Sequence, residues 1–263
     1  MRTEGMHGDH AAAAMQPSRG VGVELLRVGW FTAPAGLLRA GAAMDEMIRF
    51  PVPAYLIETE TERILVDTGL NPAAIADPGA YYGRPDTFAL FGLEQELSVA
   101  EQVDVDTITR LVLTHMHWDH VGGLGLIPAT VPVYVQRAEW DAAHEQTAIA
   151  RNSFLQRDYA GGPREVVLLD GDCDLLGDGS VALISTPGHT PGHQSVRVGD
   201  LIIGADVATF AAGLDDHRFP LFADDHAAQL RSAERLAAMR DRGAHVLVGH
   251  DPEIIRPGIL QPR

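Results

Sequence analysis

The sequence predicts an α/β fold in which two β-sheets pack face to face and helices cover both outer faces, a four-layer αββα sandwich. Short apolar runs rich in β-branched residues recur along the chain, which is typical of strands. The runs fall into two groups, and each group ends with a helical pattern, so each sheet has a helix available to cover its outer face. The two halves show no usable sequence repeat.

The predicted strands are apolar runs of similar length. Those of the first half are VELLRVGWF from Val23, AYLIET from Ala54, RILVDTG from Arg63, ITRLVLTH from Ile108, VPVYVQ from Val131 and EVVLLD from Glu165. Those of the second half are VALISTPG from Val181, QSVRV from Gln194, LIIGAD from Leu201 and HVLVGHD from His245.

The clearest helical pattern lies between the last two predicted strands. In DDHAAQLRSAERLAAMRDRG an apolar stripe recurs at helical spacing, Asp224 or Asp225 can cap the start, and Gly243 ends the pattern. A weaker helix is predicted from Arg137 to Gln146. Segments 71–100 and 147–164 lack a clear period, and we expect loops with short helical pieces that line a binding site.

The composition limits the size of the fold and its partners. With 263 residues and 46% apolar content, the chain can build one large core, and we expect a disordered tail over 1–20 followed by a single domain over 21–263. Acidic residues outnumber basic ones 36 to 20, which disfavours a nucleic-acid partner. Without an apolar stretch typical of a signal or a membrane span, we expect a cytoplasmic protein with no membrane partner.

The segment THMHWDH over residues 114–120 directly follows a predicted strand, a position where functional loops are common. An extended segment would project His115 and His117 together, while Asp119 and His120 on the following turn can face a second ion. Imidazole and carboxylate ligands without thiolates favour an open, catalytic site for zinc or another first-row divalent ion.

Further candidate ligands follow apolar runs downstream. His189 lies in STPGHTPGH, Asp206 ends LIIGAD, and His250 lies in HVLVGHD. A single histidine-rich loop is commonly a surface feature, but ligand-type residues that recur after several strands indicate a metal centre.

These motifs, in this order over residues 45–255, resemble those of the metallo-β-lactamase superfamily. The resemblance implies the αββα sandwich with metals at the sheet edges. It implies a first ion on His115, His117 and His189, a second ion on Asp119, His120 and His250, and a bridge through Asp206. A water or hydroxide between the ions is then the nucleophile, because bound cations lower the pKa of water from 15.7 to about 7.

Two further residues are expected to support the ligands. Asp67 in RILVDTG matches a family position at which an aspartate supports the metal loop by hydrogen bonding, although a simple turn aspartate before glycine is the alternative. His193 is expected to orient the loop after His189 rather than to bind metal.

Within the superfamily, the sequence resembles most the N-acyl homoserine lactonases, through LVDTG, TPGHTPGHQS, ADVATF and GHD. The resemblance implies opening of a lactone, with two cations stabilising the carbonyl oxygen and the departing alkoxide. The alternative is a glyoxalase II-like thioester hydrolase or another ester hydrolase, but the C-terminal part lacks the basic cluster expected for glutathione carboxylates.

One position departs from the lactonase pattern. Those enzymes often carry a tyrosine three residues after the bridging aspartate, where its hydroxyl assists the substrate carbonyl, and here the position is Thr209. We assign catalytic roles to Asp119, Asp206 and Thr209. Apolar residues in or near irregular segments could line an acyl pocket, although most of them are expected in the ordinary core: Trp30, Met44, Met47, Phe50, Phe88, Phe91, Phe210 and Phe219. Of these we expect Met44, Met47 and Phe210 first.

Two other classes of function stay open, an iron-dependent oxidoreductase and a non-catalytic metal-binding effector. The complete second ligand set argues against a mononuclear iron enzyme. We expect two divalent ions per chain, zinc first and iron, manganese or cobalt as alternatives. The expected partners are a small-molecule lactone or ester substrate and a second copy of the chain in a homodimer.

Overall fold

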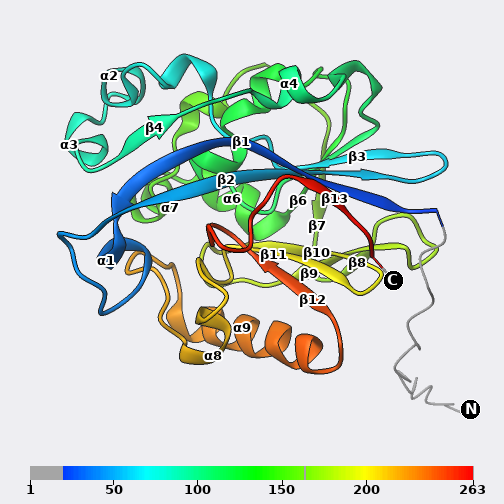
Figure 1. Cartoon of the computed structure of the whole chain (residues 1–263). Helices are drawn as coiled ribbons and strands as arrows, with labels where there is room; N and C mark the ends of the chain where they lie inside the picture. The colour runs from blue at the N-terminus through cyan, green and yellow to red at the C-terminus, as the bar shows by residue number, and fades with distance from the viewer. Residues whose placement is uncertain (1–19, 163, 263) are drawn as a thin grey trace, which may run out of the picture.

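The chain folds into the predicted four-layer αββα sandwich, as the computed structural model of residues 20–162 and 164–262 shows. In Figure 1 the two sheets lie one above the other, with α2, α3 and α4 above the upper sheet and α8 and α9 under the lower one. Helices α6 and α7 pack on the same outer face of the first sheet, through Ala142, Ala143, Ala148 and Ile149. The tail expected over 1–20 lies outside the described residues except for Gly20. No helix in the described part of the chain is long and apolar enough to cross a membrane.

The first sheet runs in the order β13-β1-β2-β3-β5-β6-β7, with β4 also paired to β1. The pairs from β13 to β3 are antiparallel, whereas β3, β5, β6 and β7 are parallel. Its strands are β1 (Gly22–Pro34), β2 (Met47–Glu58), β3 (Arg63–Val66), β4 (Gly92–Glu94), β5 (Arg110–Val112), β6 (Val133–Gln136), β7 (Val166–Leu169) and β13 (Gly258–Leu260).

The second sheet runs in the order β12-β11-β10-β9-β8. All of its pairs are antiparallel except β11 and β12, which are parallel because α9 connects them across the outer face. Its strands are β8 (Cys173–Asp174), β9 (Val181–Ser185), β10 (Gln194–Val198), β11 (Leu201–Ala205) and β12 (His245–Val248).

Most helices are short, and only α9 exceeds two turns by a wide margin. The α-helices are α1 (Ala35–Leu38), α2 (Pro78–Tyr82), α3 (Pro85–Phe88), α4 (Val99–Gln102), α5 (Trp118–Val121), α6 (Arg137–His144), α7 (Gln146–Asn152), α8 (Gly213–Asp216) and α9 (His226–Asp241). Four 3-10 turns complete the connections: η1 (Pro72–Ala74), η2 (Val105–Thr107), η3 (Gly122–Leu126) and η4 (Gln156–Asp158).

Three apolar cores separate the four layers. Alternation along the strands sends neighbouring side chains to different cores. On β3, Leu65 packs under the outer helices, while Ile64 and Val66 pack between the sheets. On β11, Ile203 faces the first sheet and Ile202 faces α9. Both sheets are therefore covered on both faces, which explains why their strands read as nearly continuous apolar runs.

All ten predicted strands are present, and β4, β8 and β13 are additional strands of two or three residues. The strong helical pattern forms α9, whose start is capped by Asp225, because its carboxylate accepts the N–H groups of Ala227 and Ala228. The weaker helix predicted from Arg137 to Gln146 divides at Glu145, whose carboxylate caps the separate helix α7.

Candidate metal centre

The first candidate ligands follow β5 directly. His115 and His117 lie on the extended loop, and α5 begins after His117, which places Asp119 and His120 in a single helical turn. The turn η3, which follows α5, packs against the loop after β3. A Cβ at Gly123 would lie 2.3 Å from the carbonyl oxygen of Thr68, so glycine permits this close approach.

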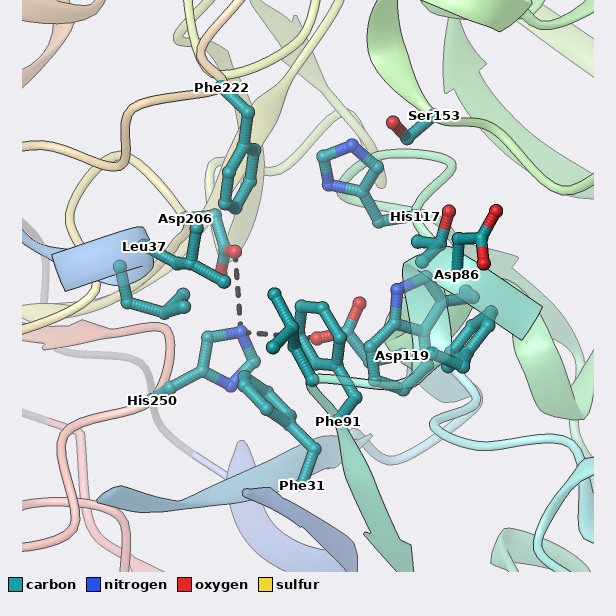
Figure 2. A pocket seen from close by; sticks show the side chains of 15 residues that line it. Phe31, Leu37, Asp86, Phe91, His117, Asp119, Ser153, Asp206, Phe222 and His250 are labelled. Atoms are coloured by element: carbon teal, nitrogen blue, oxygen red, sulfur yellow. Dashed lines mark hydrogen bonds and ion pairs between the residues drawn. The ribbon is translucent and has the colours of Figure 1, made fainter. Parts of the chain in front are cut away.

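The remaining ligands lie at one edge of the second sheet. His189 lies in the loop between β9 and β10, and Asp206 and His250 each follow a strand. Because β11 and β12 are parallel neighbours, Asp206 and His250 emerge side by side (Figure 2). All seven candidate ligands are buried and lie together at this edge.

The ligand atoms form two groups that share Asp206. In the first group, Nδ1 of His117 lies 3.0 Å from Nε2 of His115 and 3.0 Å from Nε2 of His189. In the second group, Oδ2 of Asp119 lies 3.8 Å from Nε2 of His120 and 3.4 Å from Nε2 of His250.

The carboxylate of Asp206 reaches both groups. Its Oδ2 lies 3.4 Å from Nε2 of His189 and 3.2 Å from Nε2 of His250, and its Oδ1 lies 3.5 Å from Nε2 of His120. This is the placement that a bridging carboxylate requires.

Outer hydrogen bonds determine which imidazole nitrogens face the centre. Nε2 of His117 donates to the carbonyl of Asn152 at 2.9 Å, and Nδ1 of His250 donates to that of Pro51 at 2.9 Å. Nδ1 of His120 donates to the Asp67 carboxylate at 2.8 Å. In each of these rings one nitrogen donates its N–H to an outer acceptor. The other nitrogen faces the remaining candidate ligands, where its lone pair can bind a metal ion.

Burial and charge divide the ligand histidines into two kinds. Burial lowers the pKa of His115, His117 and His189, so these rings are neutral at pH 7. Burial also lowers the pKa of His120, but Asp119, Asp206 and Asp67 outweigh it and raise the pKa to about 10. The carboxylates around His120 therefore favour a positive charge at this position, and a cation bound at Nε2 would take the place of the proton there while Nδ1 keeps its proton for Asp67.

The residues present fit two divalent cations. The spacing of 3.0 Å in the first group is close to the ~3.3 Å between tetrahedral ligands that each lie about 2.05 Å from one zinc ion. Nε2 of His120 and Oδ1 of Asp206 are buried and lack a hydrogen-bond partner in the described part of the chain. Buried polar atoms without partners are costly, and a cation between them would satisfy both.

Asp67 and His193 both lie directly behind the ligands. Besides His120, Asp67 accepts the backbone N–H of Thr114 at 2.8 Å and its hydroxyl at 2.7 Å. His193 accepts the backbone N–H of Asp206 at Nε2, 3.1 Å away, so its Nδ1 carries the proton and donates to Thr186. Both nitrogens of His193 are thus engaged, and burial lowers its pKa to about 4.

Two buried residues that hold the ligand-bearing loops were not predicted from the sequence. Glu139 on α6 accepts backbone N–H groups from both histidine loops, and Gln229 on α9 donates to the carbonyls of Asp206 and Val207. Neither residue lies in a motif. A charged or amide residue on a helix is predicted to be solvated, so no local signal in one sequence could have identified either.

A cavity of about 270 Å³ lies beside the centre, and Asp119, Asp206 and His250 form part of its wall (Figure 2). The rest of the wall is mainly apolar and comprises Phe31, Leu37, Leu38, Phe88, Leu90, Phe91, Trp118 and Phe222, with Asp86, Thr87, His117 and Ser153 as its polar members. Segment 71–100 thus contributes to the site, as expected.

The residues predicted for the acyl pocket lie elsewhere. Met44 and Met47 are 52% and 53% exposed, and Phe210 packs edge-on against Phe50; none of them lines this cavity. The position predicted for the substrate hydroxyl contact, Thr209, is buried outside the lining, and its carbonyl accepts the N–H of His250. The apolar wall instead comes from the loops around α1, α3 and α5, whose packing the sequence does not specify.

Comparison with known proteins supports the same family at the level of sequence. The profile of the Metallo-beta-lactamase superfamily matches residues 47–250. An N-acyl homoserine lactonase of Bacillus sp. is 30% identical over 223 residues, which cover 79% of this chain and 84% of the relative. The N-acyl homoserine lactonase AttM of Azorhizobium caulinodans is 29% identical over 218 residues, which cover 77% of this chain and 82% of the relative.

Solved structures show the same fold. An N-acyl homoserine lactone hydrolase with the product N-hexanoyl-L-homoserine at its catalytic metal centre gives a TM-score of 0.77 at 24% identity, covering 88% of this chain and 94% of that one. AidC, a dizinc quorum-quenching lactonase, gives a TM-score of 0.61 at 17% identity, covering 88% of each chain.

Proposed function

This chain belongs to the metallo-beta-lactamase superfamily, and we propose that it is a dinuclear metal-dependent hydrolase that opens the ring of a lactone, with N-acyl homoserine lactones as the substrate class. One observation carries the proposal. Asp206 contacts ligands of both groups and at the same time faces an apolar cavity, so a bound ester would lie against both halves of the centre.

In this proposal His115, His117 and His189 hold one ion, Asp119, His120 and His250 hold the other, and Asp206 bridges them. The ions would supply the acidification of water and the polarisation of the substrate carbonyl. Zinc is the metal we propose first, because the ligands are nitrogen and carboxylate oxygen, while iron, manganese and cobalt suit the same set.

The protein's own groups would orient the ester and handle the proton. Asp119 lies in the cavity wall, so its carboxylate can take the proton that water releases on attack and return it to the alkoxide when the ring opens. Asp206, held at its backbone by His193 and Gln229, fixes the spacing of the two ligand groups.

The apolar wall would bind the acyl part of the substrate and exclude water. Trp118 is its central side chain, with its ring edge-on to Phe31, Phe88 and Phe91 at centroid distances of 5.6, 5.6 and 6.0 Å. Thr209 would act by holding His250 through its backbone rather than by touching substrate. Met44, Met47 and Phe210 lie outside the wall, so we do not retain their contact with the acyl chain in the proposal.

The experiment compares the wild type with Asp206→Asn and His120→Ala. Both variants remove a group from the centre, so we expect loss of lactone hydrolysis with the circular dichroism spectrum retained. His226→Ala is the matched control, because this histidine is exposed at the start of α9 and is not one of the candidate ligands. Full activity of Asp206→Asn in metal-free buffer would refute the mechanism.

A substrate panel on protein of known metal content separates the remaining classes. Faster hydrolysis of glutathione thioesters than of lactones would favour a glyoxalase II-like enzyme, and one iron per chain with persulfide oxidation would favour an oxidoreductase. Absence of turnover on every substrate would favour a non-catalytic effector. A homodimer and a cytoplasmic location stay predictions, which size-exclusion chromatography with light scattering and cell fractionation would check.

A further inference from the structure

Glu139 is a fully buried carboxylate outside the ligand set. It lies in the first turn of α6, over the outer face of the first sheet, and its side chain is 0% exposed. No basic side chain forms an ion pair with it among residues 20–162 and 164–262, and burial raises the pKa of its carboxyl to about 7. A buried carboxylate without an opposite charge is costly to the fold, so its partners identify what it does.

Each carboxylate oxygen accepts one backbone N–H from a different histidine loop. Oε1 accepts from Met116 at 2.8 Å, and Oε2 accepts from Gly192 at 2.8 Å. Met116 lies between the ligands His115 and His117, and Gly192 lies three residues after the ligand His189. One side chain therefore joins the two segments that supply the first ligand group.

The contact of α6 with the second loop depends on a glycine. A Cβ at Gly192 would lie 2.2 Å from the backbone nitrogen of Glu139 and 2.7 Å from its Cβ, which no side chain could accommodate. The helix turn and the loop are thus in direct contact, and the carboxylate is held at both loops at once.

The backbones of the two segments also bond to each other directly, on the side of the loops that lies toward the strands. The N–H of Gln194 donates to the carbonyl of Thr114 at 2.9 Å, where the strands β5 and β10 adjoin the loops. Two residues closer to the candidate ligands on each segment, Glu139 joins the N–H of Met116 to the N–H of Gly192. The ligand nitrogens of His117 and His189 are only 3.0 Å apart, so a small shift of one loop would change this spacing.

We propose that Glu139 is a positioning residue that fixes the loop of His115 and His117 against the loop of His189 and thereby sets the metal affinity of this ligand group. The inference rests on the proposed metal centre, but it does not depend on which ester is the substrate.

The test is Glu139→Gln in the full-length chain. Glutamine keeps the shape but offers one acceptor oxygen and one NH2 group, so one of the two backbone N–H groups would face a donor. We expect the affinity for one of the two ions to fall about 10–100-fold, as is typical when an outer partner of a metal ligand is lost. Titration of zinc against a chromophoric chelator measures the affinity without any substrate.

A spectroscopic measurement distinguishes positioning from a general loss of stability. The cobalt-loaded variant should show altered ligand-field bands, because the geometry of one ligand group changes. Asp158→Asn is the matched control: Asp158 is also a buried carboxylate, but its hydrogen bonds go to Asn71 and Tyr82 and not to the ligand loops. It should keep the wild-type zinc affinity and cobalt spectrum.

Wild-type affinity and spectrum in Glu139→Gln would overturn the inference. If that variant does not fold, Glu139→Asp decides, because it keeps the charge but is one methylene too short to reach both N–H groups, and we expect the same weakening. Loss of the fold in both variants would assign Glu139 to global stability and would also overturn the inference. Absence of lactone hydrolysis in the wild type would refute the proposed function and leave this metal measurement unaffected.

Discussion

Replacing Asp67 by asparagine should selectively weaken the second ligand group. Asp67 has a φ of 59°, in the left-handed region that asparagine adopts readily, so the substitution leaves the backbone unstrained. The carboxylate accepts three hydrogen bonds, two from Thr114 and one from Nδ1 of His120. Asparagine can keep the bond from the Thr114 N–H, but its NH2 group then faces the other two donors.

The consequence for His120 is a change of tautomer. To accept a hydrogen bond from the new NH2 group, Nδ1 must lose its proton, and the neutral ring then carries the proton on Nε2. That atom faces Asp119 and Asp206, at 3.8 and 3.5 Å. A protonated Nε2 has no lone pair for a metal, so His120 could not bind the ion in this tautomer. In the other tautomer Nε2 could bind, but the N–H at Nδ1 would then face the NH2 group of the asparagine without an acceptor.

The expected loss is about 10–100-fold in affinity for one ion. At about 1.4 kcal/mol for each factor of ten, this corresponds to roughly 1.4–2.8 kcal/mol. That range is similar to the ~1.5–3 kcal/mol of a hydrogen bond to a charged group, which is what His120 loses.

Chelator competition with zinc and metal analysis after dialysis would measure the effect, with urea unfolding of the metal-free protein as the check on stability. Thr114→Ser serves as the control, because it keeps the hydroxyl that donates to Asp67 and leaves His120 unchanged. Two ions bound with wild-type affinity in Asp67→Asn would show that the tautomer of His120 is not set by Asp67, and the reasoning would fail.

Three further predictions concern stability. Removal of metal should lower the melting temperature, because ions that bind only the folded state at ~1,000 times their Kd stabilise it by about 4 kcal/mol; an equal melting temperature with and without zinc would contradict the proposed centre. Burial raises the pKa of Asp158 from 3.8 to about 6, so the folded state binds this proton more tightly than the unfolded state does. The free energy of unfolding should therefore fall by about 2 kcal/mol as pH rises from 4 to 6, out of about 3 kcal/mol over the whole titration, and urea titrations of metal-free Asp158→Asn should lack this part of the slope. Gly69→Ala should destabilise the fold by at least about 1–3 kcal/mol, because Gly69 has a φ of 69° and a Cβ there would lie 2.0 Å from a side-chain carbon of Val28. An unchanged urea midpoint would contradict this prediction and show that the loop after β3 can shift without a cost in stability.

The sequence alone determined the layers of the fold. Burial on both faces makes a strand apolar along its whole length, and each of the ten runs predicted in this way is a strand in the structure. The helix α9 was also predictable, because its cap at Asp225 and its apolar stripe are local features. The short strands β4, β8 and β13 were not, since two or three residues carry no period and pair only because a neighbouring edge is available.

The ligand candidates were likewise readable from the sequence, because each lies directly after an apolar strand and strand ends meet at a sheet edge. The tertiary structure alone decided what surrounds them. The cavity wall takes Phe88 from α3, Trp118 from α5 and Phe91 from the segment after α3, and no apolar period in the sequence distinguished them from Met44 and Met47, which are exposed. From the sequence, Glu139 is expected to be exposed to solvent, but the fold buries it. Its burial is possible because the N–H groups of Met116 and Gly192, which are distant in sequence, donate to its carboxylate. A sequence motif indicates which ligands its residues can bind. The burial of a residue and its hydrogen-bond partners depend on contacts between segments distant in sequence, and these contacts form only when the chain folds.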